Sequence, residues 1–155
     1  PTNQHSVSLP ARTIGINIQC PALTSFGIRA VDIASNAGSV KHDGFDANTI
    51  FSLGLTNRGE SIGGYLAAID KSRSWVDGNP LDSIIVSQDH GNSWQLMQGN
   101  LAANGKNVYS WGDKSQPRSA RFVKLGLTVS PFLFKTSYSE SVKIDGLTSF
   151  ELVYL

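Results

Sequence analysis

The segment Thr13–Cys20 alternates strictly between apolar and polar or small side chains, and no other feature constrains the fold as much. Isoleucines stand at 14, 16 and 18 and a cysteine at 20, whereas glycine, asparagine and glutamine fill the positions between them. Successive side chains of a strand point to opposite faces, so a period of two predicts a β-strand with one buried face. Pro21 has no amide hydrogen and is expected to end this strand.

Similar short segments recur along the chain, separated by Gly, Pro, Asn and Asp, which favour turns. The predicted strands are Thr13–Cys20, Phe26–Asp32, Ile50–Leu55, Ile62–Ile69, Ser83–Gln88, Ser93–Gln98, Val108–Trp111, Ala120–Val129, Tyr138–Ile144 and Leu147–Leu155. We expect hairpins between the first and second, third and fourth, fifth and sixth, and last two of these strands. Ala34–Thr49 and Ser72–Asp82 are expected to be loops, and Pro131 is expected to close the strand before it. Strands at this spacing predict an all-β sandwich or barrel.

Composition agrees with one β-domain of the secreted kind. The 155 residues suit a single domain over 1–155, and no linker or repeat divides them. Only 16% of the residues are charged, below the roughly one quarter that is usual in soluble domains. Serine, threonine, asparagine and glycine carry the polar surface instead, which is typical of extracellular β-proteins.

Charge and hydropathy exclude two classes of partner. The net charge is +1 and the basic residues are scattered, whereas a nucleic-acid binder needs a basic stripe. No apolar run reaches the roughly 20 residues that span a bilayer, so membrane insertion is not expected. The acidic residues lie mostly in predicted turns, and there is no metal-ligand spacing, nucleophile motif or phosphate loop. We therefore predict no enzyme activity, no cofactor and no metal.

Cys20 is the only cysteine of the chain and has three readings. The first is a small buried hydrophobe on the apolar face of its strand. A catalytic thiol would need a histidine partner, and no motif ties His5, His42 or His90 to it. The third reading is a disulfide to a cysteine outside this sequence.

The segment Ser87–Trp94 fits the pattern S-x-D-x-G-x-S/T-W and resembles the Asp box, a hairpin turn of sialidases and other secreted β-proteins. Asp89 is expected to accept hydrogen bonds from turn amides, Gly91 to take a conformation costly to other residues, and Trp94 to pack under the turn. We interpret Ser87, Asp89, Gly91 and Trp94 as a structural turn. A secreted glycosidase fragment is the weaker reading of the same motif.

Aromatic residues suggest a contact with sugars. Trp94 and Trp111 lie within predicted strands, where packing explains them. Trp75 lies in a predicted loop among Ser74, Asp77 and Gly78, which makes it the candidate for contact with a host glycan.

Three stretches together resemble the chaperone–usher fimbrial (pilus) subunits, most closely the β-fimbria-type pilins once known as a domain of unknown function. They are Leu9–Pro21, Ser87–Trp94 and the Asp145-Gly146 turn with the strand ending at Leu155. The resemblance runs along essentially the whole chain. It implies an immunoglobulin-like β-sandwich that is incomplete and is completed by a donor strand from another subunit.

The resemblance also implies partners and a location. The partners would be neighbouring fimbrial subunits, a periplasmic chaperone and an outer-membrane usher, and the protein would be secreted through the periplasm to the cell surface. The strand Leu147–Leu155 would border the acceptor groove. Its expected apolar walls are Val123, Leu125, Leu127, Phe150, Leu152 and Tyr154.

One part of the family pattern is missing. Pilins carry an N-terminal extension and a first strand whose cysteine bridges to the position of Cys20, and Pro1–Ser8 holds neither. We expect that piece to be absent from this chain, and Cys20 to bridge to its cysteine. The expected function is a structural subunit of a fimbria, and the alternative is a carbohydrate-binding adhesin domain of the same assembly class.

Overall fold

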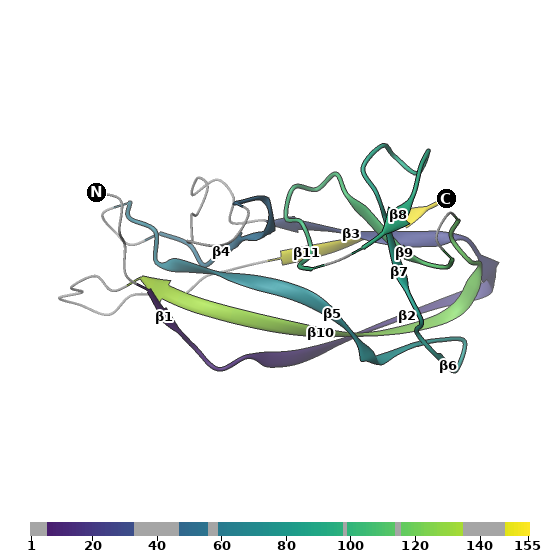
Figure 1. The fold of residues 1–155 in the computed structure, drawn as a ribbon, viewed down its shortest axis with the longest axis horizontal. Coiled ribbons are helices and arrows are strands. Elements are labelled where there is room, and N and C mark those ends of the chain that lie inside the picture. The colour runs from purple at the N-terminus through teal and green to yellow at the C-terminus, as the bar shows by residue number, and fades with distance from the viewer. Residues whose placement is uncertain (1–5, 33–46, 56–58, 98, 114–115, 135–147) are drawn as a thin grey trace.

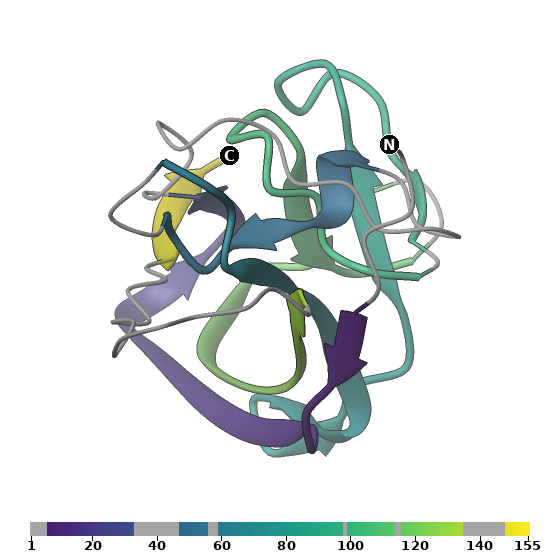
Figure 2. The same cartoon turned by 90° about the vertical axis from the view of Figure 1, so that its left-hand side faces the viewer.

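The computed structural model describes residues 6–32, 47–55, 59–97, 99–113, 116–134 and 148–155, and it forms two antiparallel β-sheets. The sheets pack face to face around a main apolar cluster to which both contribute, so the expected all-β sandwich is confirmed. Figure 1 shows the long strands of the first sheet below the strands of the second, and Figure 2 shows the same fold after a quarter turn. The helical structure in the described residues is one 3-10 turn, Ala47–Thr49.

The first sheet is built around its longest strand, β10. Its strands are β1 (Ser6–Ser8), β2 (Arg12–Thr24), β4 (Phe51–Ser52), β5 (Gly63–Val76), β6 (Asn79–Pro80) and β10 (Ala120–Phe134). β1 and β2 pair with successive parts of one side of β10, and β5 pairs with the other side. β10 is therefore central, and β2 forms one edge.

The second sheet has the order β11-β3-β9-β7-β8. Its strands are β3 (Phe26–Asp32), β7 (Ile84–Ser87), β8 (Gln95–Leu96), β9 (Val108–Trp111) and β11 (Thr148–Tyr154). The hairpins expected around residues 57–59 and 89–91 are confirmed, because β4 pairs with β5 and β7 pairs with β8. The partner expected for β11 was Tyr138–Ile144, which lies outside the described residues, as does most of the expected loop Ala34–Thr49.

The hairpin expected between the first two strands was wrong. β2 pairs with β10 in the first sheet, and β3 pairs with β11 and β9 in the second. The chain crosses between the sheets at Ser25, so the apolar faces of β2 and β3 point into the same core from opposite sides. Alternation predicts which face of a strand is buried, but it does not say which strand is the neighbour.

Two prolines do not end their strands as expected. β2 continues through Pro21 to Thr24, and β10 continues through Pro131 to Phe134. Pro21 stands on an edge strand, between Gln19 and Thr24, where the pairing with β10 is irregular, so its missing amide hydrogen interrupts no regular ladder. Pro131 lies between the segments paired with β1 and β2, and its carbonyl accepts a 2.9 Å hydrogen bond from the Leu9 amide.

The loop expected over Ser72–Asp82 was also wrong, because β5 runs to Val76 across a β-bulge. The Ser74 hydroxyl donates to the Asp70 carbonyl at 2.7 Å and accepts from the Gly126 amide at 3.0 Å. A serine side chain thus takes the place of a backbone partner in the ladder. Polar residues inside a strand made this segment look like a loop.

Candidate functional site

Strand β11 is an edge of the second sheet in the part of the chain that the structure describes. It pairs with β3 over its whole length, and no described strand pairs with its other side. The Leu155 amide donates to the Ser25 carbonyl at 3.0 Å. Backbone groups of an antiparallel strand alternate between its two sides, so those of Phe150, Leu152 and Tyr154 point to the unpaired side.

Three apolar side chains of β11 face the core but are incompletely covered. Phe150, Leu152 and Tyr154 stand opposite residues of β3 that are almost fully buried. Phe150 packs against the core, whereas Leu152 is 39% exposed and Tyr154 is 71% exposed. On the other face, Arg29 and Glu151 form an ion pair at 2.8 Å. Apolar exposure on the core side of a strand indicates that no neighbour in the described part of the chain covers it fully.

Strand β2 shows the same arrangement at the edge of the first sheet. Ile14, Ile16 and Ile18 stand opposite three residues of β10 that are fully buried. Ile14 is nevertheless 50% exposed, and Ile16 and Ile18 are half-buried. These isoleucines therefore point towards the core side of the sandwich, but no described residues cover them fully.

The two edges meet at one corner of the molecule. β2 ends at Thr24, and the carbonyl of the next residue, Ser25, holds the end of β11 through the Leu155 amide. β2 and β3 diverge from this corner as two arms, with β11 alongside β3 (Figure 1). We call this edge pair the open side; its residues are Ile14, Ile16, Ile18, Phe150, Leu152 and Tyr154.

Three of the six residues predicted as groove walls do not lie on the open side. Val123, Leu125 and Leu127 lie in the closed core, because β10 is paired on both sides by β2 and β5. The isoleucines of β2 take their place at the edge. A signal for this was present in the sequence, because Pro21 within an apolar run marks an edge strand.

Cys20 is buried on the core side of β2, as the alternation predicts. It belongs to the main apolar cluster together with residues of both sheets. A disulfide to a cysteine outside this chain stays a prediction.

The turn Ser87–Trp94 is held by the Asp89 carboxylate. Its oxygens accept hydrogen bonds from the Ser87 hydroxyl at 2.8 Å, the Ser93 amide at 2.9 Å and the Ser93 hydroxyl at 2.5 Å. These bonds lower the pKa of Asp89 to about 2, with those from Ser93 contributing most. The Gly91 amide donates to Ser87, and the Trp94 indole donates to the Gly91 carbonyl. Every one of these contacts is internal to the turn.

Trp75 lies within β5, not in a loop. Its neighbours across the sheet are Lys124 and Pro80. The Lys124 ammonium lies 5.4 Å from the centre of the indole ring and covers one of its faces. A sugar stacking on that face would have to displace the lysine.

Comparisons with protein-family models, curated proteins and solved structures gave no match. Within the described residues, no group of three or more His, Cys, Asp or Glu side chains is placed to hold a metal ion. None of the described helical residues forms a helix long and apolar enough to cross a membrane.

Proposed function

We propose that this chain is a structural subunit of a surface fimbria whose immunoglobulin-like sandwich is completed by a strand from a neighbouring subunit. The observation that carries the proposal is the open side. Two edge strands, one in each sheet, meet at a corner and leave the apolar side chains of their core faces partly exposed. A single inserted strand would cover both edges at once.

The inserted strand would add to the fold by β-augmentation. Its backbone would pair with the groups of Phe150, Leu152 and Tyr154 that point away from β3, and alternate side chains would fill the space beside the β2 isoleucines. Each large apolar side chain that is fully covered contributes about 1.5–3 kcal/mol. Ladder bonds give affinity, and the shapes of the side chains select the partner.

The same geometry supports the partners that the family resemblance implies. An uncovered apolar edge is a site of aggregation, so such a subunit needs a protecting partner before assembly. A periplasmic chaperone would supply it, and an outer-membrane usher would release the subunit to the cell surface. In that oxidising compartment Cys20 could form its bridge to an upstream cysteine.

A donor segment fused after Leu155 tests the proposal. Because β11 ends at the shared corner, a short flexible linker lets the added segment turn back beside β11, antiparallel to both β11 and β2. We expect cooperative thermal unfolding at a higher Tm than that of the unfused chain. A net gain of about 3 kcal/mol, the size of one buried large side chain, raises the Tm of a chain this long by roughly 6–12 °C.

The matched control carries the same linker and segment with serine at the apolar positions that would face the core. It should leave the Tm unchanged. A second control is Leu152→Arg in the fused chain, which should abolish most of the gain because the charge would lie under the added strand. An apolar donor that raises Tm no more than its serine version would mean that the sandwich is already complete.

A further inference from the structure

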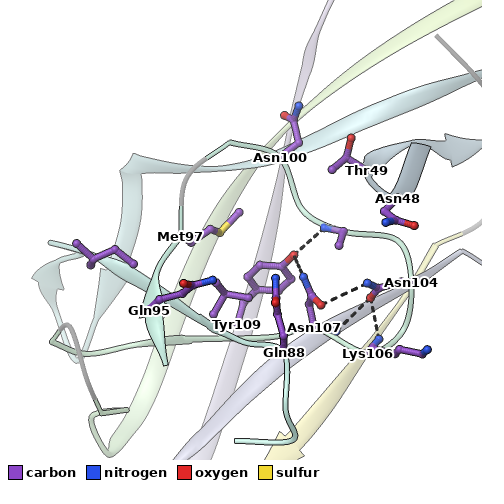
Figure 3. Close-up of a pocket in the computed structure, with 13 residues that line it drawn as sticks. Asn48, Thr49, Gln88, Gln95, Met97, Asn100, Asn104, Lys106, Asn107 and Tyr109 are labelled. Atoms are coloured by element: carbon purple, nitrogen blue, oxygen red, sulfur yellow. Dashed lines mark hydrogen bonds between the residues drawn. The ribbon is translucent and has the colours of Figure 1, made fainter. Parts of the chain in front are cut away.

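A polar hollow lies in the second sheet, away from the open side. Its volume is about 410 Å³, within the range of small-molecule sites. Among the described residues, six side-chain amides line it (Figure 3), those of Asn48, Gln88, Gln95, Asn100, Asn104 and Asn107. No lining residue belongs to β2 or β11, so the hollow and the open side can be tested separately.

Several elements bring these amides together. Gln88 follows β7, Gln95 lies on β8, and the segment 100–107 leads into β9. Asn48 and Thr49 come from the 3-10 turn, far away in the sequence. The hollow therefore exists only in the folded domain.

Part of the wall is held in place by its own hydrogen bonds. The Asn104 side-chain oxygen accepts from the Lys106 amide at 2.8 Å and from the Asn107 amide at 3.1 Å. Tyr109 is buried, and its hydroxyl oxygen accepts from the Ala102 amide at 2.7 Å and the Asn107 side chain at 3.5 Å. Burial raises the pKa of Tyr109, so the phenol stays neutral and keeps its proton for a further acceptor. The wall is pre-organised to make additional polar contacts.

We infer that this hollow binds a small neutral saccharide. The amides of Gln88, Gln95 and Asn100 each carry a donor and an acceptor, and each sugar hydroxyl needs both, so these amides match an array of hydroxyls. Asn104 and Asn107 shape the wall through their bonds to each other and to Tyr109. Leu96 and Met97 supply an apolar patch on which the C–H face of a sugar ring can pack. This assigns glycan contact to the amide hollow and not to Trp75.

The charges at the hollow disfavour other ligands. Among the residues that the structure describes, no carboxylate lines it, so a cation or an amine finds no counter-charge there. Lys106 is the one cation among the described lining residues and is exposed, and such a charge contributes little to binding. A phosphate would be expected to bring several cations together.

The experiment is an NMR titration of the ¹⁵N-labelled chain with glucose, galactose, mannose and N-acetylglucosamine in turn. We expect at least one sugar to shift the signals of residues 104–107 and of the lining side-chain amides in a saturable way. Titration to about 10 mM detects a Kd near 1 mM. The Kd should be insensitive to added salt, because the ligand is uncharged.

The decisive variant is Gln88→Ala with Gln95→Ala, which removes two exposed amides of the wall. Each lost hydrogen bond should weaken binding by about twofold to tenfold. Gln19→Ala, which removes an exposed strand glutamine of the other sheet, is the matched control and should bind as the original chain does. Equal Tm values exclude a folding defect in the double variant. The inference is overturned if no sugar gives saturable shifts, if the double variant binds unchanged, or if salt weakens binding strongly.

Discussion

Asp89 shows how one side chain holds a turn together. Its carboxylate accepts hydrogen bonds from Ser87 and Ser93, and this lowers its pKa from 3.8 to about 2. A carboxyl group whose pKa is lower in the folded state stabilises the fold at pH values above its unfolded pKa. That contribution is lost as the pH falls through the folded pKa.

We therefore expect Asp89→Asn to lower the free energy of unfolding at neutral pH. The difference from the original chain should shrink between about pH 4 and pH 2, because protonation neutralises Asp89 in the original chain and the asparagine of the variant is neutral at every pH. Urea unfolding at a series of pH values measures it. A difference that stays constant down to pH 2 would contradict a role for the ionised carboxylate.

Gly63 is required where β5 passes close to β10. Its φ is +152°, and an added Cβ would collide with the Phe132 carbonyl oxygen. We expect Gly63→Ala to cost more than about 1–3 kcal/mol, since the collision adds to the backbone strain. Gly15→Ala is the control, because nothing lies within 4 Å of its Cβ, and it should change stability by less than about 0.5 kcal/mol. Urea unfolding compares the two.

Among the strands, β10 and β11 carry similar apolar alternation but occupy different places. β10 is central, and its Leu125 is 1% exposed, whereas β11 is an edge whose Leu152 is 39% exposed. The consequence of truncating a leucine should therefore differ between them.

We expect Leu125→Ala to destabilise the unfused chain by about 2–5 kcal/mol, because it leaves a cavity in a closed core. Leu152→Ala should cost less than about 1 kcal/mol in the unfused chain, since part of its surface is already in water. In the chain with the fused donor the cost of Leu152→Ala should rise. Equal costs for Leu152→Ala with and without the donor would argue against the open side as the acceptor.

The molecule as a whole exposes apolar side chains at two strand edges, β2 and β11, in its described part. Exposed apolar edges pair with other chains. We expect the unfused chain to self-associate reversibly as its concentration rises and the donor-fused chain to stay monomeric. Analytical ultracentrifugation measures both. The substitution Leu152→Lys should reduce self-association of the unfused chain. An unfused chain that is monomeric at all concentrations would contradict the prediction.

Sequence patterns over a few neighbouring residues predict part of the fold. The all-β class, the hairpins β4–β5 and β7–β8 and the burial of Cys20 could be predicted, because a period of two and turn residues act over a few neighbouring positions. The hydrogen bonds of the Asp89 turn likewise join residues at most four positions apart.

Sheet membership and edge position could not be predicted in this way, because they depend on pairing between distant segments. β2 is an edge because it pairs with β10 and not with β3, and the chain therefore crosses between the sheets at Ser25. Val123, Leu125 and Leu127 are buried because β10 is paired on both sides. The bulge that keeps Trp75 in a strand depends on a bond between Ser74 and Gly126. The amide hollow likewise joins residues 48 and 107. Such contacts form only when the sheets pack. The alternation of apolar residues does not specify them, because any neighbouring strand that covers the apolar face would bury it equally well.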